Sequence, residues 1–257
     1  IFILHPRIFA QSFYNSKDII FLSLFIISIY FFCKFFKNRS LSNIVYLGLS
    51  LALLTSVRSI GFYCLIVLFL FMFAEILDKK VELKEIIKLI LYISIAYFLF
   101  LYLFWPFLWE DPIKNFLYAL KSFSDYGWGG QVFYFGKFYE PNSLPWHYIP
   151  VWILGTISIP FSFLIVISIL FVITRLVRRI LNIDSLRERA TFWNSRLELI
   201  LLFNLLLILS PVILIIFKNS TLYNGWRHLF FILPSMTILC LSLIHYTKII
   251  IKKNKFL

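Results

Sequence analysis

The chain has 257 residues, of which 61% are hydrophobic and 20% aromatic, and its mean hydropathy is +0.89. This composition excludes a soluble globular domain and predicts an all-α polytopic membrane protein. The net charge of +13 does not indicate nucleic-acid binding, because the cations lie at the ends of apolar stretches and not in a basic patch with interleaved aromatics. Cys33, Cys64 and Cys240 lie inside apolar stretches without CxxC spacing, so neither a disulfide framework nor a metal site is predicted.

About seven stretches are long enough, or nearly so, to form transmembrane helices, which need about 20 apolar residues each. They cover residues 19–36, 41–57, 60–77, 86–104, 151–174, 197–217 and 229–247. Pro160, Pro211 and Pro234 fall inside three of them, where we expect kinks. We interpret residues 1–257 as one membrane domain. Because residues 1–4 resemble the end of an earlier helix, we expect this domain to be the C-terminal part of a larger protein.

The distribution of basic residues predicts the orientation of these spans. Of the 25 Lys and Arg residues, 17 fall in one set of alternating connections, which the positive-inside rule assigns to the cytoplasm. The N-terminal segment, the turn at Arg58, the loop 105–150 and the segment around Arg227 then share the extracytoplasmic face. Four separate polar clusters are therefore predicted to converge there.

The loop 105–150 replaces the apolar pattern with Trp, Tyr, Gly, Pro and a few charges. Asp111 before Pro112 favours a helix N-cap. The apolar residues between Ile113 and Phe123 recur at helical spacing, which predicts an amphipathic helix lying in the membrane interface. Residues 132–140 alternate around Gly136-Lys137 and predict a short hairpin with glycine first in its turn.

Each polar cluster has a structural and a functional interpretation. Around the first span, Asp18 or Ser16 could cap the helix and Lys17 could anchor it, or these residues could line an outer pocket together with His5 and Arg7.

Arg58 has no carboxylate within several residues, so it needs an anionic partner. That partner is either a lipid phosphate or a buried anion. We favour a specifically bound phosphate, because a guanidinium binds phosphate through two parallel hydrogen bonds.

Two further clusters precede the fifth and seventh spans. Trp146, His147 and Tyr148 could form part of an aromatic belt, but His147 is also suited to proton handling. Asn224, Arg227 and His228 could anchor the interface. Cations at a helix start are unfavourable for the helix dipole, and a bound anion would resolve that conflict.

In this order, the segments HPRIFAQSFYNSKD, SVRSIGF, PFLWEDPIKNF, LPWHYIPVWIL and NGWRHLFFILP resemble bacterial GT-C membrane glycosyltransferases. The nearest resemblance, over most of the chain, is to the protein O-mannosyltransferases and aminoarabinose lipid A transferases of glycosyltransferase family 39 and its relatives. It implies an active site on the extracytoplasmic face of the bacterial inner membrane. There a sugar would pass from a polyprenyl-phosphate-linked donor to a lipid, glycan or protein acceptor, with membrane lipids as further partners.

The resemblance assigns roles to some residues and leaves others open. Arg58 and Arg227 would stabilise charge on the phosphate leaving group, and a carboxylate would act as general base. The family's key acidic residue belongs to an outer loop upstream of Ile1, so the chain by itself is expected to lack it. Asp18 and Glu110 remain as candidates, although neither matches that motif. No cofactor is predicted, and a divalent metal is left open. The predicted substrate-binding residues are His5, Arg7, Lys17, Arg58, Trp146, His147, Tyr148, Asn224, Arg227 and His228.

Two other functions are weighed against this one. A transporter or flippase for lipid-linked glycans predicts internal repeats and polar groups within the spans, whereas Asn204 is the main polar residue inside a span. A membrane scaffold would not need Arg58, His147, Arg227 and His228 on one face.

Overall fold

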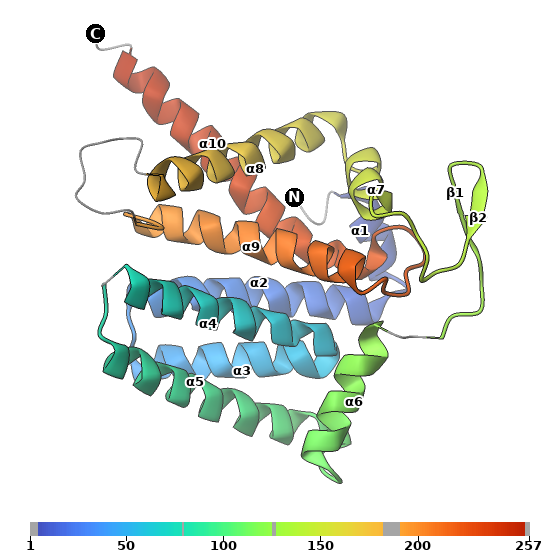
Figure 1. The fold of residues 1–257 in the computed structure, drawn as a ribbon, viewed down its shortest axis with the longest axis horizontal. Coiled ribbons are helices and arrows are strands. Elements are labelled where there is room, and N and C mark those ends of the chain that lie inside the picture. The colour runs from blue at the N-terminus through green and yellow to red at the C-terminus, as the bar shows by residue number, and fades with distance from the viewer. Residues whose placement is uncertain (1–4, 79, 125–126, 182–190, 255–257) are drawn as a thin grey trace.

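The computed structural model describes residues 5–78, 80–124, 127–181 and 191–254. Within these ranges the chain is mostly helical, with one small two-stranded sheet. Figure 1 shows the long helices running side by side, with the short elements gathered at one end. The α-helices are α1 (Pro6–Ser12), α2 (Ser16–Lys37), α3 (Leu41–Val57), α4 (Phe62–Leu77), α5 (Leu83–Phe104), α6 (Pro112–Ser124), α7 (Tyr148–Thr156), α8 (Ile159–Ile180), α9 (Arg196–Phe217) and α10 (Leu233–Asn254). Three 3-10 helices are η1 (Ser59–Gly61), η2 (Pro106–Leu108) and η3 (Arg227–Ile232), and the strands are β1 (Val132–Tyr134) and β2 (Lys137–Tyr139).

Six helical segments of the described chain are long and apolar enough to cross a membrane, as an integral membrane protein requires. They are Ser16–Lys37, Ser59–Leu77, Leu83–Phe104, Ile159–Ile180, Arg196–Phe217 and Arg227–Lys248. The helix expected as the second span, α3, is apolar but only 17 residues long. The prediction of a helical fold with several apolar spans is confirmed, while a count of seven stays a prediction.

The fifth expected span, 151–174, is wrong as a single helix. The chain forms α7 and α8, which are separated at Ile157 and Ser158. Pro160 therefore lies in the first turn of α8, where its missing N–H leaves no helical hydrogen bond unmade. Pro234 likewise lies in the first turn of α10, after η3, and only Pro211 lies inside its helix.

The loop contains both elements that the sequence predicts. Helix α6 begins at Pro112, and Asp111 Oδ1 accepts the Lys114 backbone N–H at 3.1 Å, which confirms the cap. The hairpin pairs Val132 with Tyr139 and Tyr134 with Lys137. Its turn is one residue earlier than expected, at Phe135 and Gly136, whose φ angles are 46° and 77°. Two consecutive positive φ values are typical of the type I′ turn, whose twist matches the strands.

The polar clusters lie at one end of the bundle, as expected. Helix α1, helix α6, the hairpin and the start of η3 are at this end, together with the α3–η1 turn (Figure 1). The α2–α3 and α4–α5 connections lie at the other end, with the C-terminal end of α8 and the N-terminal end of α9. Four segments that are distant in sequence therefore meet at one surface.

Candidate functional site

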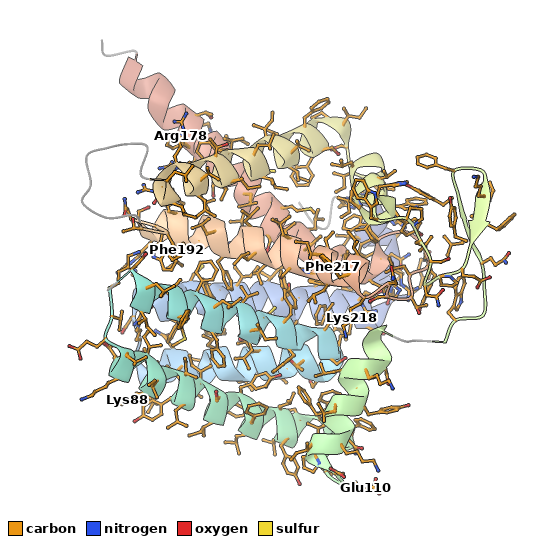
Figure 2. The ribbon with its side chains drawn as sticks, in the orientation of Figure 1. Lys88, Glu110, Arg178, Phe192, Phe217 and Lys218 are labelled. Atoms are coloured by element: carbon orange, nitrogen blue, oxygen red, sulfur yellow. The ribbon has the colours of Figure 1, made fainter. Side chains whose placement is uncertain are left out.

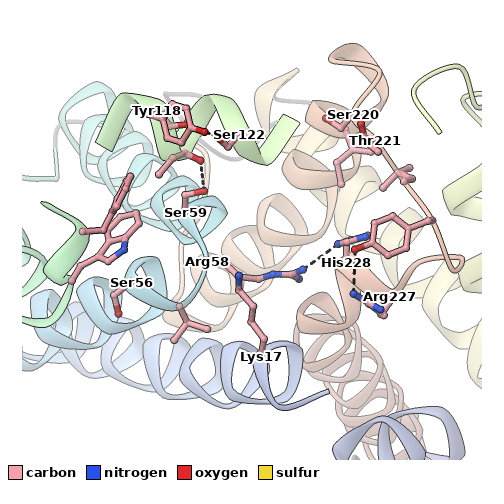
Figure 3. A pocket seen from close by; sticks show the side chains of 17 residues that line it. Lys17, Ser56, Arg58, Ser59, Tyr118, Ser122, Ser220, Thr221, Arg227 and His228 are labelled. Atoms are coloured by element: carbon pink, nitrogen blue, oxygen red, sulfur yellow. Dashed lines mark hydrogen bonds between the residues drawn. The ribbon is translucent and has the colours of Figure 1, made fainter. Parts of the chain in front are cut away.

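A cavity of about 500 Å³ opens at the end of the bundle where these segments meet. Figure 3 shows that its walls come from α2, the end of α3, α6, the 220–223 segment and η3. Lys17, Arg58, Arg227 and His228 all line it, so the structure brings together residues from three separately predicted clusters. A cavity of this size can hold a small organic ligand.

Asp18 is buried and lies between the two arginines. Its Oδ1 is 2.6 Å from Arg58 Nη1, and its Oδ2 is 3.1 Å from Arg227 Nε. The structure corrects one expectation here. Asp18 does not cap α2, because the Asn15 side chain accepts its backbone N–H. Of the two kinds of partner expected for Arg58, the structure shows a buried anion, the carboxylate of Asp18, from a helix 40 positions earlier in the chain. A specifically bound phosphate stays a prediction.

Arg58 also binds His228, since its Nη2 lies 3.1 Å from His228 Nδ1. A guanidinium has no acceptor, so Nδ1 must accept and a neutral His228 carries its proton on Nε2. That Nε2 is buried and has no hydrogen-bond partner among the described residues. An N–H left without a partner in a cavity wall is a donor available to a ligand.

Among the residues that the structure describes, the charge balance of the cavity is positive. Lys17, Arg58 and Arg227 carry three cations, and Asp18 supplies one negative charge to this group. Burial lowers the pKa of Arg58 from its ordinary value, Asp18 raises it and Arg227 lowers it further. Arginine stays charged despite this, because its ordinary pKa lies far above neutrality. The excess positive charge favours an anionic ligand.

Neutral polar groups complete the lining, and none of them is among the residues predicted from the sequence. They are Ser and Thr residues at or near the ends of helices. In a sequence, a hydroxyl residue that lines a cavity looks the same as one at an ordinary helix end. Ser59 Oγ donates to the Ala119 carbonyl at 2.9 Å and thereby ties η1 to α6. The amphipathic helix α6 is thus a wall of the cavity. The hydroxyl residues of the lining are Ser56, Ser59, Ser122, Ser220 and Thr221.

A second group of predicted residues lies outside the cavity, around Trp152. Arg7 Nη2 donates to the Asn224 carbonyl at 3.1 Å, and its guanidinium lies 5.7 Å from the Trp152 ring. Tyr148 Oη accepts the Gly225 N–H at 3.1 Å. These contacts hold α1, α7 and the 223–226 turn together, which is a structural role.

The other candidates are also apart from the cavity. His5 caps α1, accepting the Ile8 N–H at 3.5 Å. His147 Nδ1 lies 2.9 Å from Tyr134 Oη and docks the hairpin, while Trp146 beside it is exposed. Glu110 is exposed near the start of α6, where Figure 2 labels it.

Within the described ranges, no group of three or more His, Cys, Asp or Glu side chains is placed to hold a metal ion. Comparison with protein-family models, with curated proteins and with solved structures gives no match to this chain.

Proposed function

We propose that this protein transfers a sugar from a polyprenyl-phosphate-linked donor to a hydroxyl of a lipid, glycan or protein acceptor. The observation that carries the proposal is the pair Arg58 and Arg227, held by one buried carboxylate in the wall of a net-positive cavity. In such a transfer negative charge grows on the phosphate as the sugar leaves. Preorganised cations stabilise the second charge that develops on the leaving phosphate more than they stabilise the ground state, in which the phosphodiester carries a single charge.

The surroundings of the two arginines suit a lipid-linked phosphate. The cavity lies at the end of apolar helices, so a polyprenyl chain can stay in the hydrocarbon while its phosphate reaches the cations. The Nε2–H of His228 adds a neutral donor to these charges, and Lys17 adds an exposed cation. Hydroxyls and aromatic rings of the lining, such as Ser59, Tyr118 and Trp105, match the polar edges and apolar faces of a sugar.

In this proposal Asp18 holds the two arginines and is not the general base. Its two oxygens already face Arg58 and Arg227, so neither is directed at an acceptor hydroxyl in the cavity. Glu110 is exposed and does not line the cavity. The described part of the cavity lining contains no carboxylate, so this chain's proposed contribution is donor binding and stabilisation of the leaving phosphate.

We also propose the orientation and location of the protein. With α3 as a short seventh span, the connections alternate between the two sides of the membrane and 17 of the 25 Lys and Arg residues share one side. The positive-inside rule then makes that side cytoplasmic and the cavity extracytoplasmic. The resemblance of the sequence segments to bacterial transferases favours the bacterial inner membrane.

The test uses the intact protein in proteoliposomes that contain radiolabelled polyprenyl-phosphate sugars and a set of acceptors. We expect Arg58→Lys and Arg227→Lys to lower the transfer rate about 100-fold, as the loss of a transition-state donor does. His228→Gln is expected to lower it less. The matched control is Lys137→Ala, which removes a cation from the exposed hairpin at the same end of the molecule.

Thermal unfolding of each variant separates lost activity from lost folding. Full activity in both arginine variants, with wild-type melting, would overturn the site. Movement of the lipid-linked sugar across the bilayer without transfer would replace the proposed function by that of a flippase.

A further inference from the structure

A second cavity, of about 270 Å³, lies at the opposite end of the bundle and is lined by residues of α8 and α10. Figure 2 labels Arg178 at this end of α8. The lining residues are Phe171, Thr174, Arg175, Arg178, Arg179 and Tyr246. Three of the six are arginines from about one turn of α8. The proposed sugar transfer does not involve them.

Two of these arginines are fixed in place by a carboxylate. Nη2 of Arg175 and Nη2 of Arg179 each donate to Glu198 Oε1 at 2.7 Å. The other oxygen of Glu198 accepts the Asn194 N–H at 2.9 Å. Glu198 therefore has both oxygens occupied within the chain, and its single charge is shared by two guanidiniums. With Arg178 included, the described part of this cluster has two more positive charges than negative ones.

Aromatic rings and exposure complete the site. The Arg175 guanidinium lies 5.1 Å from the Tyr246 ring and 5.5 Å from the Phe171 ring, which restricts its orientation. Arg178 is exposed and has no hydrogen-bond or charged partner among the described residues. Among the described residues, one unpaired guanidinium thus lies beside two preorganised ones at the edge of an open cavity.

We propose that this cavity binds the phosphate headgroup of an anionic phospholipid. Guanidiniums bind phosphate oxygens through two parallel hydrogen bonds, and basic pockets between transmembrane helices are suited to lipid headgroups. The apolar surface for the acyl chains adjoins the site, because Leu170 and Ile167 lie about two and three turns before Arg178 on α8 and are half exposed. Cations that only orient the helix in the membrane would need neither a cavity nor a shared carboxylate.

This site is independent of the proposed transferase activity, because it lies at the other end of the bundle and shares no residue with the first cavity. Its failure would leave the transferase proposal unaffected, and the reverse also holds. The binding test needs no sugar donor.

The experiment measures lipid binding to the intact, detergent-purified protein by native mass spectrometry. Phosphatidylglycerol is titrated first, and phosphatidylcholine with the same acyl chains is titrated in parallel. We expect one phosphatidylglycerol to bind selectively, and Arg178→Ala to weaken its binding about fivefold, since one basic residue near a lipid phosphate contributes about 1 kcal/mol. Because Arg178 has no described partner, the variant is expected to melt like the wild type.

The matched control is Arg196→Ala, which removes an exposed cation from the start of α9 at the same end but outside the cavity. Its phosphatidylglycerol affinity is expected to stay at the wild-type value. An equal loss in both variants, or none in Arg178→Ala, would overturn the proposal in favour of general attraction to anionic surfaces. Displacement of the lipid by millimolar inorganic phosphate would overturn it in favour of a site for free phosphate.

Discussion

Asp18 Oδ1 lies 2.6 Å from Arg58 Nη1, and the two side chains are 2% and 11% exposed. Asp18 belongs to the first turn of α2, whereas Arg58 ends α3. Since the same carboxylate also faces Arg227 at the start of η3, it joins three segments at the wall of the larger cavity. The pair therefore supports both the fold of this end and the position of the proposed phosphate-binding groups.

Asp18→Asn is expected to lower the free energy of unfolding by about 3 kcal/mol, because two arginines at a mostly buried site lose their counter-charge. Thermal or denaturant unfolding in detergent measures this loss. Glu110→Gln is the control, since it neutralises an exposed carboxylate at the same end and should change stability by less than about 0.5 kcal/mol.

A double-mutant cycle identifies the contact responsible. Asp18→Asn combined with Arg58→Gln should destabilise the protein less than the sum of the two single changes, with a coupling of about 1 to 3 kcal/mol. Strictly additive effects would show that Asp18 and Arg58 contribute independently and would contradict the ion pair as a stabilising contact.

The sequence predicted the parts of this protein that depend on local pattern. Apolar runs gave the long helices, the Asp111-Pro112 pair gave the start of α6, and alternation around Gly136 gave the hairpin. Lys17, Arg58, Arg227 and His228 were predicted to lie at one end because the connections of successive spans alternate between the two sides, which depends only on chain order. The count of basic residues then distinguishes the two sides.

Contacts between distant segments could not be predicted in this way. Asp18 and Arg58 are 40 positions apart, and no periodicity relates the end of α3 to the start of α2. The same holds for the contact of Arg7 with the backbone carbonyl of Asn224 beside Trp152. A role of these two residues in substrate binding stays a prediction. Side-chain partners across a bundle depend on helix rotation and depth, which a single sequence does not specify.

Tyr148→Phe is expected to lower the stability of the protein at neutral pH and to lower it less at alkaline pH. Burial raises the pKa of Tyr148 above its ordinary value of 10.0, although the Gly225 N–H and Arg7 act in the opposite direction. The folded state therefore holds this proton longer than the unfolded state. The associated stability is fully present below about pH 10 and is lost as the pH rises through the folded pKa.

Unfolding curves of the two proteins between about pH 7 and pH 11 test this expectation. At pH 7 Tyr148→Phe should be about 1 kcal/mol less stable, because the buried Gly225 N–H loses its acceptor. Above pH 10 the difference should shrink, since only the wild type must keep a buried phenol protonated. Curves that stay parallel throughout would show that Tyr148 is not the group whose ionisation matters.

Phe135→Asn is expected to stabilise the hairpin by about 1 kcal/mol. Phe135 has φ 46°, a left-handed conformation that costs most side chains energy, and Asn before Gly is favoured in type I′ turns. Its ring is 73% exposed, so little packing is lost. Amide hydrogen exchange across residues 132–139 should slow. Faster exchange would mean that the ring contacts with Tyr134 and His147 outweigh the backbone strain.

Gly48→Ala is expected to destabilise the contact between α3 and α5 by about 1 to 3 kcal/mol, as overpacking does. A Cβ at position 48 would lie 2.7 Å from the Ala96 Cβ and 3.0 Å from the Tyr97 backbone nitrogen. The two helices would have to separate, and the hydrogen bond of 3.0 Å from Tyr97 Oη on α5 to Thr55 Oγ1 on α3 would weaken with them. Thermal unfolding in detergent measures the effect.

Two further variants make the steric explanation specific. Gly155→Ala adds the same methyl group to α7, where nothing lies within 4 Å, and should be neutral or stabilising because alanine favours helix. Gly48→Ala with Ala96→Gly removes the shortest contact and should recover part of the lost stability. If the double variant is no more stable than Gly48→Ala, the backbone contact with Tyr97, and not the Ala96 methyl group, sets the closest approach of the two helices.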